Sequence, residues 1–393
     1  MPFASRWLRT ETAVPRQVFI NGCFTRRAFM RLCRVITSCV LLLAPLGVAV
    51  AQVAPSAGPV DASTRQAVVA SLGKQMQANY VFPDVASKVA AALDAKVAGH
   101  AYEHDATTDT FAKALTHDLQ SVGMDRHLRI MYDPTFKPDE NDDTALTPKQ
   151  IDEQRTMASQ YAYGIAKVER LPGNVGYLDI RGFLPADFVA TGYAAAMNLV
   201  AGSDALIIDL RKNGGGDPSS VATLLSYFFA EGDSRHLNDL YWRKGDKTQQ
   251  FWTAAVSGPR YTRPVYVLTS ALTFSGGEEC AYDFQTQKRA TLVGTSTGGG
   301  ANPGDVFALG HGFVAFIPVG RAVNPVTHTN WEHVGVKPDI AVPAADAMKT
   351  AYVAILKKQI VTTKDPDQLD RLKATLARVE KGVEEKPNYD PPK

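Results

Sequence analysis

The chain has 393 residues, a hydrophobic fraction of 45%, a charged fraction of 21% and a formal net charge of +2. This length allows two or three folding units with a sizeable core, and the composition is ordinary for a globular protein. The near-neutral charge gives no bulk electrostatic argument for binding nucleic acid or an anionic surface, so no nucleic-acid partner is expected.

The first 51 residues are predicted to be a signal peptide. Arg26 and Arg27 precede an apolar run over residues 35–50, and the run ends in a small-x-small pattern at 49–51. A basic segment, an apolar segment and a cleavage pattern in this order are typical of secretory signals. The run is short for a membrane-spanning helix of about 20 residues. We therefore expect cleavage after Ala51 and export to the periplasm or the medium.

Two alternatives concern this leader. The paired arginines followed by Phe29 resemble a twin-arginine export signal, whereas a start at Met30 would leave an ordinary secretory signal. Three of the four cysteines fall before residue 52, so only Cys280 remains in the mature chain. No internal disulfide can then form, and a free cysteine in an apolar helical stretch is expected to be buried.

A small helical domain is predicted over residues 56–135. Apolar residues recur every three or four positions over 63–80, again from Pro83 to Gly99, and around 111–119. This spacing is typical of amphipathic helices, and Pro83 and Gly99 are favoured helix boundaries. Residues 136–169 read as a linker, with helix-like sequence returning over 148–163.

An α/β core is predicted over residues 170–345. Apolar runs rich in β-branched residues alternate with helical patterns at 219–230 and 276–285. The runs lie at 175–180, 205–210, 265–268, 291–294 and 313–318. Such alternation indicates a largely parallel sheet. The range 346–393 is predicted to hold a helix near 347–358, followed by a charged tail.

A glycine turn follows the run at 205–210, where Gly214, Gly215 and Gly216 precede Pro218. Glycines allow backbone N–H groups to approach a ligand, and N–H groups at a strand-to-helix turn can bind an oxyanion. The segment taken alone is equally compatible with a simple tight turn.

Ser275 lies between the run at 265–268 and the helical pattern that starts at Gly276. The first N–H groups of a helix have no intrahelical partner, so Gly276 could donate to an oxyanion beside a serine nucleophile. Taken alone, the segment is better explained as a helix cap, with Glu278 completing a capping box.

His127 and Glu332 are the candidates for a base and its assisting acid. The alternating pattern over 123–130 predicts an edge strand that carries His127, and histidine is the usual base for a serine. Each residue taken alone is more often a surface histidine or a solvated acid. No cluster of His and Cys has the spacing of a zinc site, so neither a metal nor a cofactor is expected.

Together these segments resemble the tail-specific, or C-terminal processing, peptidase family. The matching motifs, in order, are Asp-Leu-Arg-x-Asn-x-Gly-Gly at 209–216, Thr-x-Ser-x-x-Glu at 273–278, Gly-x-x-Thr-x-Gly at 294–299 and Glu-x-x-Gly-Val-x-Pro-Asp at 332–339. The resemblance implies an α/β fold, with a crotonase-like or ClpP-like β-α superhelix core preceded by a small helical N-terminal domain. It also implies that Thr297, Gly298 and Gly299 contact substrate.

One departure points to a branch of the family. The Ser–Lys members carry a lysine about twenty-five residues beyond the serine, where this chain has Gly300. The chain instead resembles the branch with the tricorn core and the interphotoreceptor retinoid-binding protein modules, whose base is an earlier histidine assisted by a glutamate. Asp-x-His at 125–127 and Glu332 match that pattern. The Tyr-Val-Phe-Pro segment at 80–83 also resembles the N-terminal domain of bacterial members of this branch.

The implied function is a serine-type endopeptidase or carboxyl-terminal processing peptidase, which acts on unfolded protein or peptides through an acyl-enzyme. His127 would deprotonate Ser275, Glu332 would orient the imidazole, and N–H groups of Gly276 and of Gly215 or Gly216 would bind the oxyanion. One alternative is a non-catalytic carrier of a retinoid or fatty acid on the same fold. Another is a peptidase that uses Lys212 or Lys288 as its base.

Overall fold

The computed structural model describes residues 58–138 and 146–382, so the predicted signal peptide lies outside the described residues. Within these ranges, no helix combines the length and the apolar character that a membrane crossing requires.

Three helices form the N-terminal part, as the amphipathic spacing predicted. They are α2 (Ala62–Asn79), α3 (Pro83–Ala98) and α4 (Thr108–Gly123). The side chain of Asp61 caps α2 by accepting a hydrogen bond from the Thr64 N–H, and α3 ends at Gly99. The side chains of Leu72, Leu93 and Leu115 are fully buried or nearly so, and their burial holds the three helices together.

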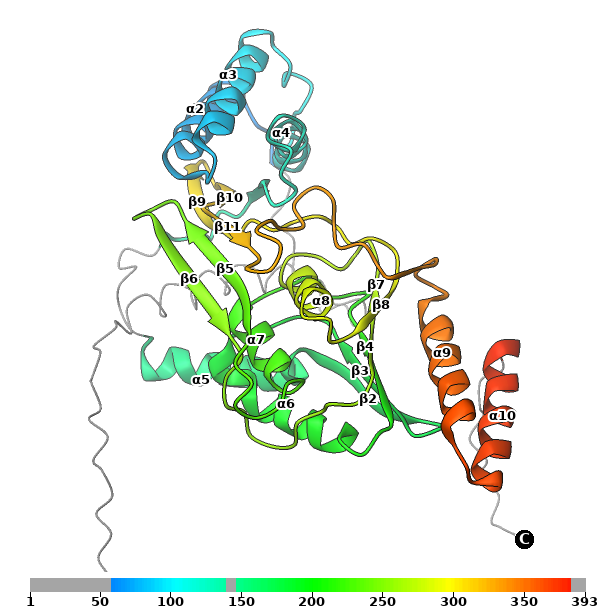
Figure 1. Cartoon of the computed structure of the whole chain (residues 1–393). Helices are drawn as coiled ribbons and strands as arrows, with labels where there is room; N and C mark the ends of the chain where they lie inside the picture. Colours follow the sequence, from blue (N-terminus) through cyan, green and yellow to red (C-terminus); the bar gives the residue numbers. More distant parts are fainter. Residues whose placement is uncertain (1–57, 139–145, 383–393) are drawn as a thin grey trace, which may run out of the picture.

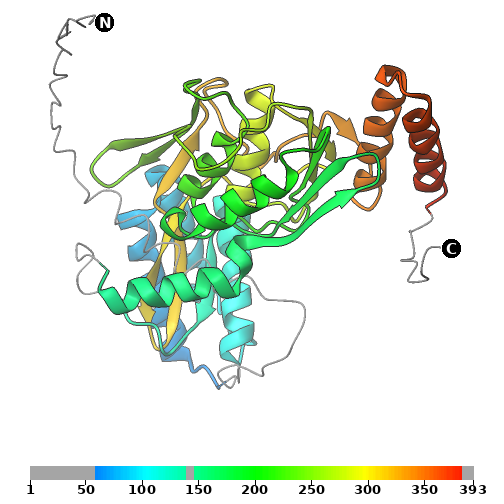
Figure 2. The ribbon, with the colours of Figure 1, turned by 90° about the horizontal axis from the view of Figure 1, so that it is seen from below.

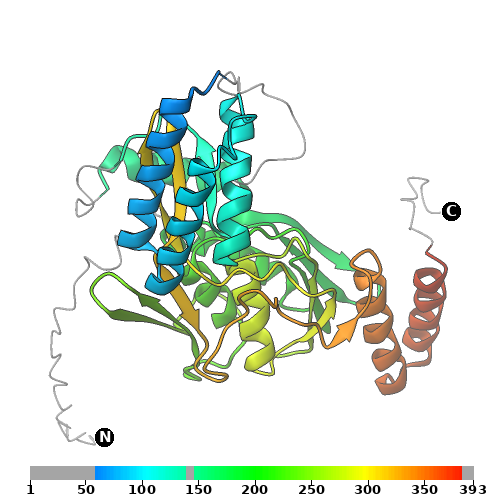
Figure 3. The same ribbon diagram turned by 90° about the horizontal axis from the view of Figure 1, so that it is seen from above.

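These helices pack on a sheet whose strands come from two parts of the chain that are far apart in the sequence. Strand β1 (Arg129–Tyr132) pairs with β10 (Phe313–Pro318), which pairs with β9 (Gly304–Gly310), and all pairings are antiparallel. Figure 3 shows the N-terminal helices lying against β9 and β10. The rings of Phe111 and Phe313 meet edge to face with their centroids 5.5 Å apart. The run at 313–318 is thus a strand, but it completes the N-terminal part and not the central sheet.

The central sheet has the strand order β12-β8-β7-β4-β3-β2 and is parallel except for the β2–β3 pair. Its strands are β2 (Ile165–Leu171), β3 (Val175–Ile180), β4 (Ala205–Asp209), β7 (Val265–Thr269), β8 (Thr291–Gly294) and β12 (Ile340–Ala341). The parallel sheet predicted from the alternation of strands and helices is confirmed. The last residues of the range predicted as a linker form β2, after α5 (Pro148–Gln160) and the short helix η1 (Ala162–Gly164).

Helices cover both faces of this sheet, so β3, β4 and β7 are buried throughout. The core on one face includes residues of α6 (Ala186–Val200), α7 (Pro218–Ser226) and α8 (Gly276–Thr286), packed with strand residues such as Ile208. The core on the other face includes α9 (Ala347–Thr362), which packs with Ile207 and Tyr266. Helix α10 (Pro366–Lys381) lies beside α9 at the opposite end of the molecule from α5 (Figures 1 and 2).

A third sheet, β11-β5-β6, was not predicted from the sequence. It consists of β5 (His236–Trp242), β6 (Lys247–Trp252) and β11 (Gly320–Val323). The polar residues in β5 and β6 hide the apolar alternation on which strand prediction depends. This sheet brings Leu240 and Trp242 to the cavity beside the start of α8.

Candidate active site

One cavity of about 270 Å³ brings together the segments singled out in the sequence. Its lining includes His127 from the turn before β1, residues 214–216 after β4, residues 274–276 at the start of α8, and Gly300 with Ala301 after β8. The carboxyl ends of parallel strands meet at one edge of a sheet, which is why the loops after β4, β7 and β8 converge. Lys212 and Lys288 are exposed and do not line this cavity.

Ser275 occupies the N-cap position of α8, as predicted, in a strained backbone conformation. Its φ is 52° and its ψ is −123°, a region that residues other than glycine rarely adopt. Such a conformation costs about 1–3 kcal/mol and persists only where the surroundings enforce it, commonly at functional sites. The N–H groups of Glu278 and Glu279 donate to the Ser275 carbonyl. The turn therefore holds Ser275 at the cavity while α8 continues into the core.

Two unpaired N–H groups lie next to Ser275. Within the described part of the chain, the N–H groups of Gly216 and Gly276 donate to no protein acceptor. The Gly215 N–H, in contrast, donates to Oδ1 of Asn213 at 2.8 Å. Of the three glycines predicted for the oxyanion site, Gly216 and Gly276 thus have free N–H donors, whereas the N–H of Gly215 is used by its hydrogen bond to Asn213. A Cβ at Gly216 would lie 1.9 Å from the Phe183 carbonyl oxygen, so this backbone approach requires glycine.

His127 lies in a turn and not in the edge strand that the alternating pattern predicted. Oδ1 of Asp125 accepts a hydrogen bond from the backbone N–H of His127 at 2.9 Å, and the Leu128 N–H donates to the Asp125 carbonyl. This local bonding closes a turn before β1 begins at Arg129. The imidazole is nearly buried and rests against the ring of Phe274, with the ring centroids 4.6 Å apart.

Asp125 is the site residue that the sequence reasoning did not assign a role. Its carboxylate is 1% exposed and lies 3.7 Å from Nδ1 of His127. Oδ2 accepts hydrogen bonds from the Tyr80 hydroxyl at 3.1 Å and from the Asn302 amide at 2.9 Å. Although burial raises the pKa of Asp125, its bonds to His127 and Asn302 more than compensate and leave the pKa below its ordinary value. The Asp-x-His spacing was the signal that could have identified it.

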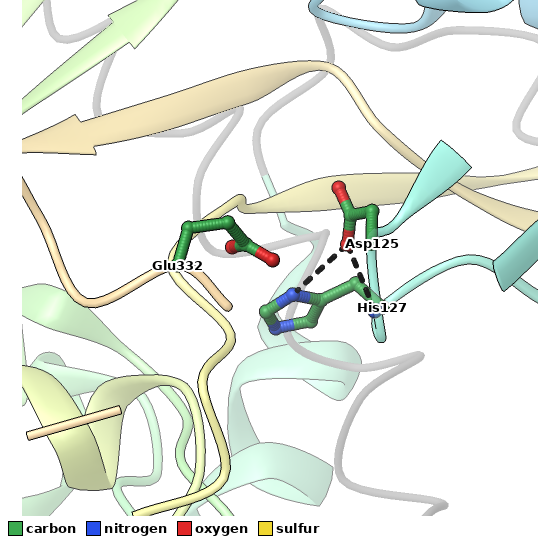
Figure 4. A group of neighbouring side chains, drawn as sticks. All are labelled: Asp125, His127 and Glu332. Atoms are coloured by element: carbon green, nitrogen blue, oxygen red, sulfur yellow. Dashed lines mark hydrogen bonds and ion pairs between the residues drawn. The ribbon is translucent and has the colours of Figure 1, made fainter. Parts of the chain in front are cut away.

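Glu332 lies on the same side of the imidazole as Asp125, but its pKa is shifted in the opposite direction. Figure 4 shows the carboxylates of Asp125 and Glu332 both directed at the ring, whose second nitrogen faces away from them. Oε2 of Glu332 accepts from the Ala301 N–H at 2.5 Å, whereas Oε1 accepts no hydrogen bond from the described residues and lies 3.7 Å from Nδ1 of His333. Burial and the nearby Asp125 charge raise the pKa of Glu332 to about 8, so Glu332 is mostly neutral at pH 7.

The imidazole has no hydrogen bond in this structure. Neither ring nitrogen of His127 has a hydrogen-bond partner among the described residues, so the Ser275–His127 hydrogen bond is not formed at rest. Ligand atoms of Asp125, His127 and Glu332 lie within 4.8 Å of one another, which is close enough for a metal site. Asp125 already accepts three hydrogen bonds, which leave about one lone-pair site on its carboxylate. The same three side chains can also serve as a base with two assisting acids.

Glu278 has a larger role than the helix cap suggested by its position. Its buried carboxylate accepts four hydrogen bonds, from the N–H groups of Ser275, Gly299 and Gly300 and from the Thr297 hydroxyl. Glu278 thus fastens the loop after β8 to the turn that carries Ser275.

The three residues expected to contact substrate do not line the cavity. The polar groups of Thr297 and Gly299 bind Glu278, and the Gly298 carbonyl accepts from Arg126 at 2.6 Å. Gly300 and Ala301, the next two residues, line the cavity instead.

The fold is a largely parallel α/β sheet with an attached helical domain, and its cavity brings together Ser275 and His127. The profile described as Peptidase family S41 matches residues 174–342, and the profile described as N-terminal domain of Peptidase_S41 in eukaryotic IRBP matches residues 62–169. The chain belongs to peptidase family S41, a family of serine-type hydrolases. The predicted resemblance is thereby confirmed at the level of the family, and the second match agrees with the retinoid-binding-like N-terminal domain.

One curated protein and two solved structures are similar to this chain. A carboxyl-terminal-processing protease of Synechocystis sp. is 30% identical over 170 residues, which are 43% of this chain and 38% of that protein. A structure of a proposed peptidase from Parabacteroides merdae has a TM-score of 0.52 at 19% identity, covering 77% of this chain and 98% of that one, and so shares the fold. The photosystem II D1 C-terminal processing protease has a TM-score of 0.43 at 15% identity, covering 72% of this chain and 94% of that one.

Proposed function

We propose that this chain is a serine-type peptidase that cleaves unfolded protein or peptide substrates through an acyl-enzyme. The observation that carries the proposal is that Ser275 shares one cavity with an imidazole beside an acid and with two free N–H groups. Similarity to a carboxyl-terminal-processing protease over part of its length favours cleavage near a substrate carboxyl end.

In the proposed mechanism His127 takes the hydroxyl proton as Ser275 attacks the peptide carbonyl. The N–H groups of Gly216 and Gly276 donate to the oxyanion, and one such donor is typically worth about 10²–10³-fold in turnover. The imidazolium then protonates the leaving amine, and water releases the acyl group. Catalytic hydrogen bonds often shorten only when substrate binds, so the resting geometry of His127 is compatible with this role.

Covalent labelling of Ser275 tests the proposal directly. We expect a fluorophosphonate probe to label the wild-type protein at Ser275, located by peptide mass mapping, and to leave Ser275→Ala unlabelled. Casein and unstructured peptides, with free or amidated carboxyl ends, should be cleaved by the same preparation. EDTA should not abolish cleavage, because the site chemistry proposed here requires no metal ion. Loss of cleavage in EDTA with labelling absent would refute the serine mechanism.

A carrier of hydrophobic ligands is the alternative, and the apolar cavity walls formed by Phe183, Leu240 and Trp331 favour it. A carrier has no reason to activate Ser275, so its serine should resist the probe. Tight binding of retinoid or fatty acid without labelling would support the carrier and not the peptidase.

We also propose that the protein is exported. The basic and apolar pattern before residue 52 supports this proposal. Expression of the whole chain in a bacterial host should yield a mature protein outside the cytoplasm, with Gln52 as its first residue by N-terminal sequencing. Arg26→Lys combined with Arg27→Lys should block export if the twin-arginine route is used. An uncleaved chain that fractionates with the cytoplasm would contradict the proposal.

A further inference from the structure

A second glutamate, Glu279, lines the cavity beside Ser275. Glu279 follows Glu278 on α8 and lines the cavity, whereas the carboxylate of Glu278 binds the loop after β8. Glu279 is only 4% exposed, and its Oε1 has no hydrogen-bond partner among the described residues. A buried carboxyl oxygen without a hydrogen-bond partner is destabilising, so a ligand that supplied a donor would remove this cost.

Among the described residues, the charged groups that act most strongly on Glu279 are acidic. Asp217 and Asp283 are buried, and each interacts electrostatically with Glu279. Oδ2 of Asp283 also has no hydrogen-bond partner among the described residues. Asn238 lies close to Glu279, but no hydrogen bond of normal geometry joins the two side chains. Burial is the main cause that raises the pKa of Glu279 to about 8. A cation bound beside Glu279 would favour loss of the carboxyl proton and would then pair with the negative carboxylate.

The walls of this part of the cavity are apolar. Leu240 and Trp242 from β5, Phe183 before α6, and Trp331 beside Glu332 all line it. Lysine and arginine have long aliphatic stems that pack on apolar surface, and their cationic heads are attracted to aromatic faces. An aliphatic substrate side chain would pack on the same walls but would leave the carboxyl group of Glu279 without a hydrogen-bond donor.

The cavity also contains the attacking group and the oxyanion donors, namely Ser275, Gly216 and Gly276. The side chain next to the attacked carbonyl can therefore enter the same cavity. Two arginines, Arg126 and Arg129, line the wall formed by the turn before β1, and Arg126 is bound to the Gly298 carbonyl. A substrate cation is thus repelled from that wall and attracted to the acidic one.

We propose that Glu279 is a specificity-determining residue, which selects substrates with lysine or arginine immediately before the bond that is cleaved. This inference rests on the proposed peptidase function. One basic substrate side chain would bind the carboxyl group of Glu279, pack on the apolar walls and be attracted by the acidic surroundings.

The test is a set of fluorogenic peptides that differ only at that residue, with arginine, lysine, leucine, tyrosine or glutamate. For the wild type we expect kcat/KM to be at least about tenfold higher for arginine and lysine than for leucine. Glu279→Gln should lower the arginine-to-leucine ratio by about 10–100-fold, because a hydrogen bond to a charged group is worth about 1.5–3 kcal/mol. Glu231→Gln removes the same charge from an exposed loop after α7 and should leave the ratio unchanged.

A binding measurement without turnover separates specificity from a structural role. Benzamidine should slow fluorophosphonate labelling of Ser275 in the wild type and have at least tenfold weaker effect in Glu279→Gln, with equal thermal melting confirming that both are folded. A wild-type preference for leucine, tyrosine or glutamate would overturn the inference while labelling still supported the peptidase. A ratio that Glu279→Gln leaves unchanged would overturn it as well. Absence of both labelling and cleavage would instead overturn the proposed function.

Discussion

Alanine in place of Ser275 or of His127 is expected to lower kcat by about 10⁴-fold or more, with little change in KM. Ser275 supplies the nucleophile, and the buried imidazole supplies the only histidine base on the described cavity wall. Because both residues act in one step, the double variant should be no slower than the slower single variant. Steady-state kinetics on one unstructured peptide, with active-site titration of the wild type, measures all three rates.

Two lysine variants provide the control for this prediction. Lys212→Ala and Lys288→Ala should retain wild-type kcat, since both lysines are exposed and lie away from the cavity lining. If Lys212→Ala lost activity while His127→Ala kept it, a lysine base would replace the histidine mechanism.

The pH profile of kcat distinguishes the two acids beside His127. The pKa of Asp125 is lowered, so Asp125 is ionised across the neutral range and Asp125→Asn should reduce kcat at pH 7 and at pH 9. The pKa of Glu332 is raised to about 8, so its charge appears only as the pH rises through that value. Glu332→Gln mimics the neutral form and should therefore cost more at pH 9 than at pH 7. An equal loss at both pH values would show that the charge of Glu332 does not contribute to catalysis.

The parallel sheet and the position of Ser275 at the start of a helix could both be predicted from the sequence. Strand prediction succeeded for β3, β4, β7 and β8 because burial on both faces makes them continuous apolar runs. The helix start at Gly276 followed from the turn residues before it. These features are local, so a short stretch of residues specifies each of them.

The features that the sequence could not provide depend on distant partners. Nothing near Asp125 in the sequence indicates that Tyr80 and Asn302 bind its carboxylate, 45 residues before it and 177 after it. The capping-box spacing of Glu278 correctly gave one bond, to the Ser275 N–H, but the bonds to the loop after β8 arise only on folding. His127 was placed in a strand because its neighbours alternate in polarity, whereas the Asp125 side chain closes a turn there.

Replacing Glu278 by alanine is expected to damage stability and catalysis together. The carboxylate has about four lone-pair sites, and four donors use them. Their loss leaves three N–H groups and a hydroxyl without an acceptor in a buried place, so the free energy of unfolding should fall by on the order of 3 kcal/mol or more. The loop after β8 would also release the turn that holds Ser275, and displacement by about 1 Å can lower kcat about 10²-fold.

Graded variants of the same contact separate this prediction from a general effect of mutating the core. Glu278→Gln keeps the volume and one acceptor oxygen but presents an amide to two donors, so its loss should be intermediate. Thr297→Ser retains the hydroxyl that donates to Glu278 and should be close to wild type, whereas Thr297→Val removes it and also leaves the Val336 N–H without its acceptor. Urea denaturation and kcat should rank the four variants in the same order, because one network supports both the loop and the serine turn. If Glu278→Ala kept wild-type kcat while its urea midpoint fell, the carboxylate would stabilise the fold without positioning Ser275.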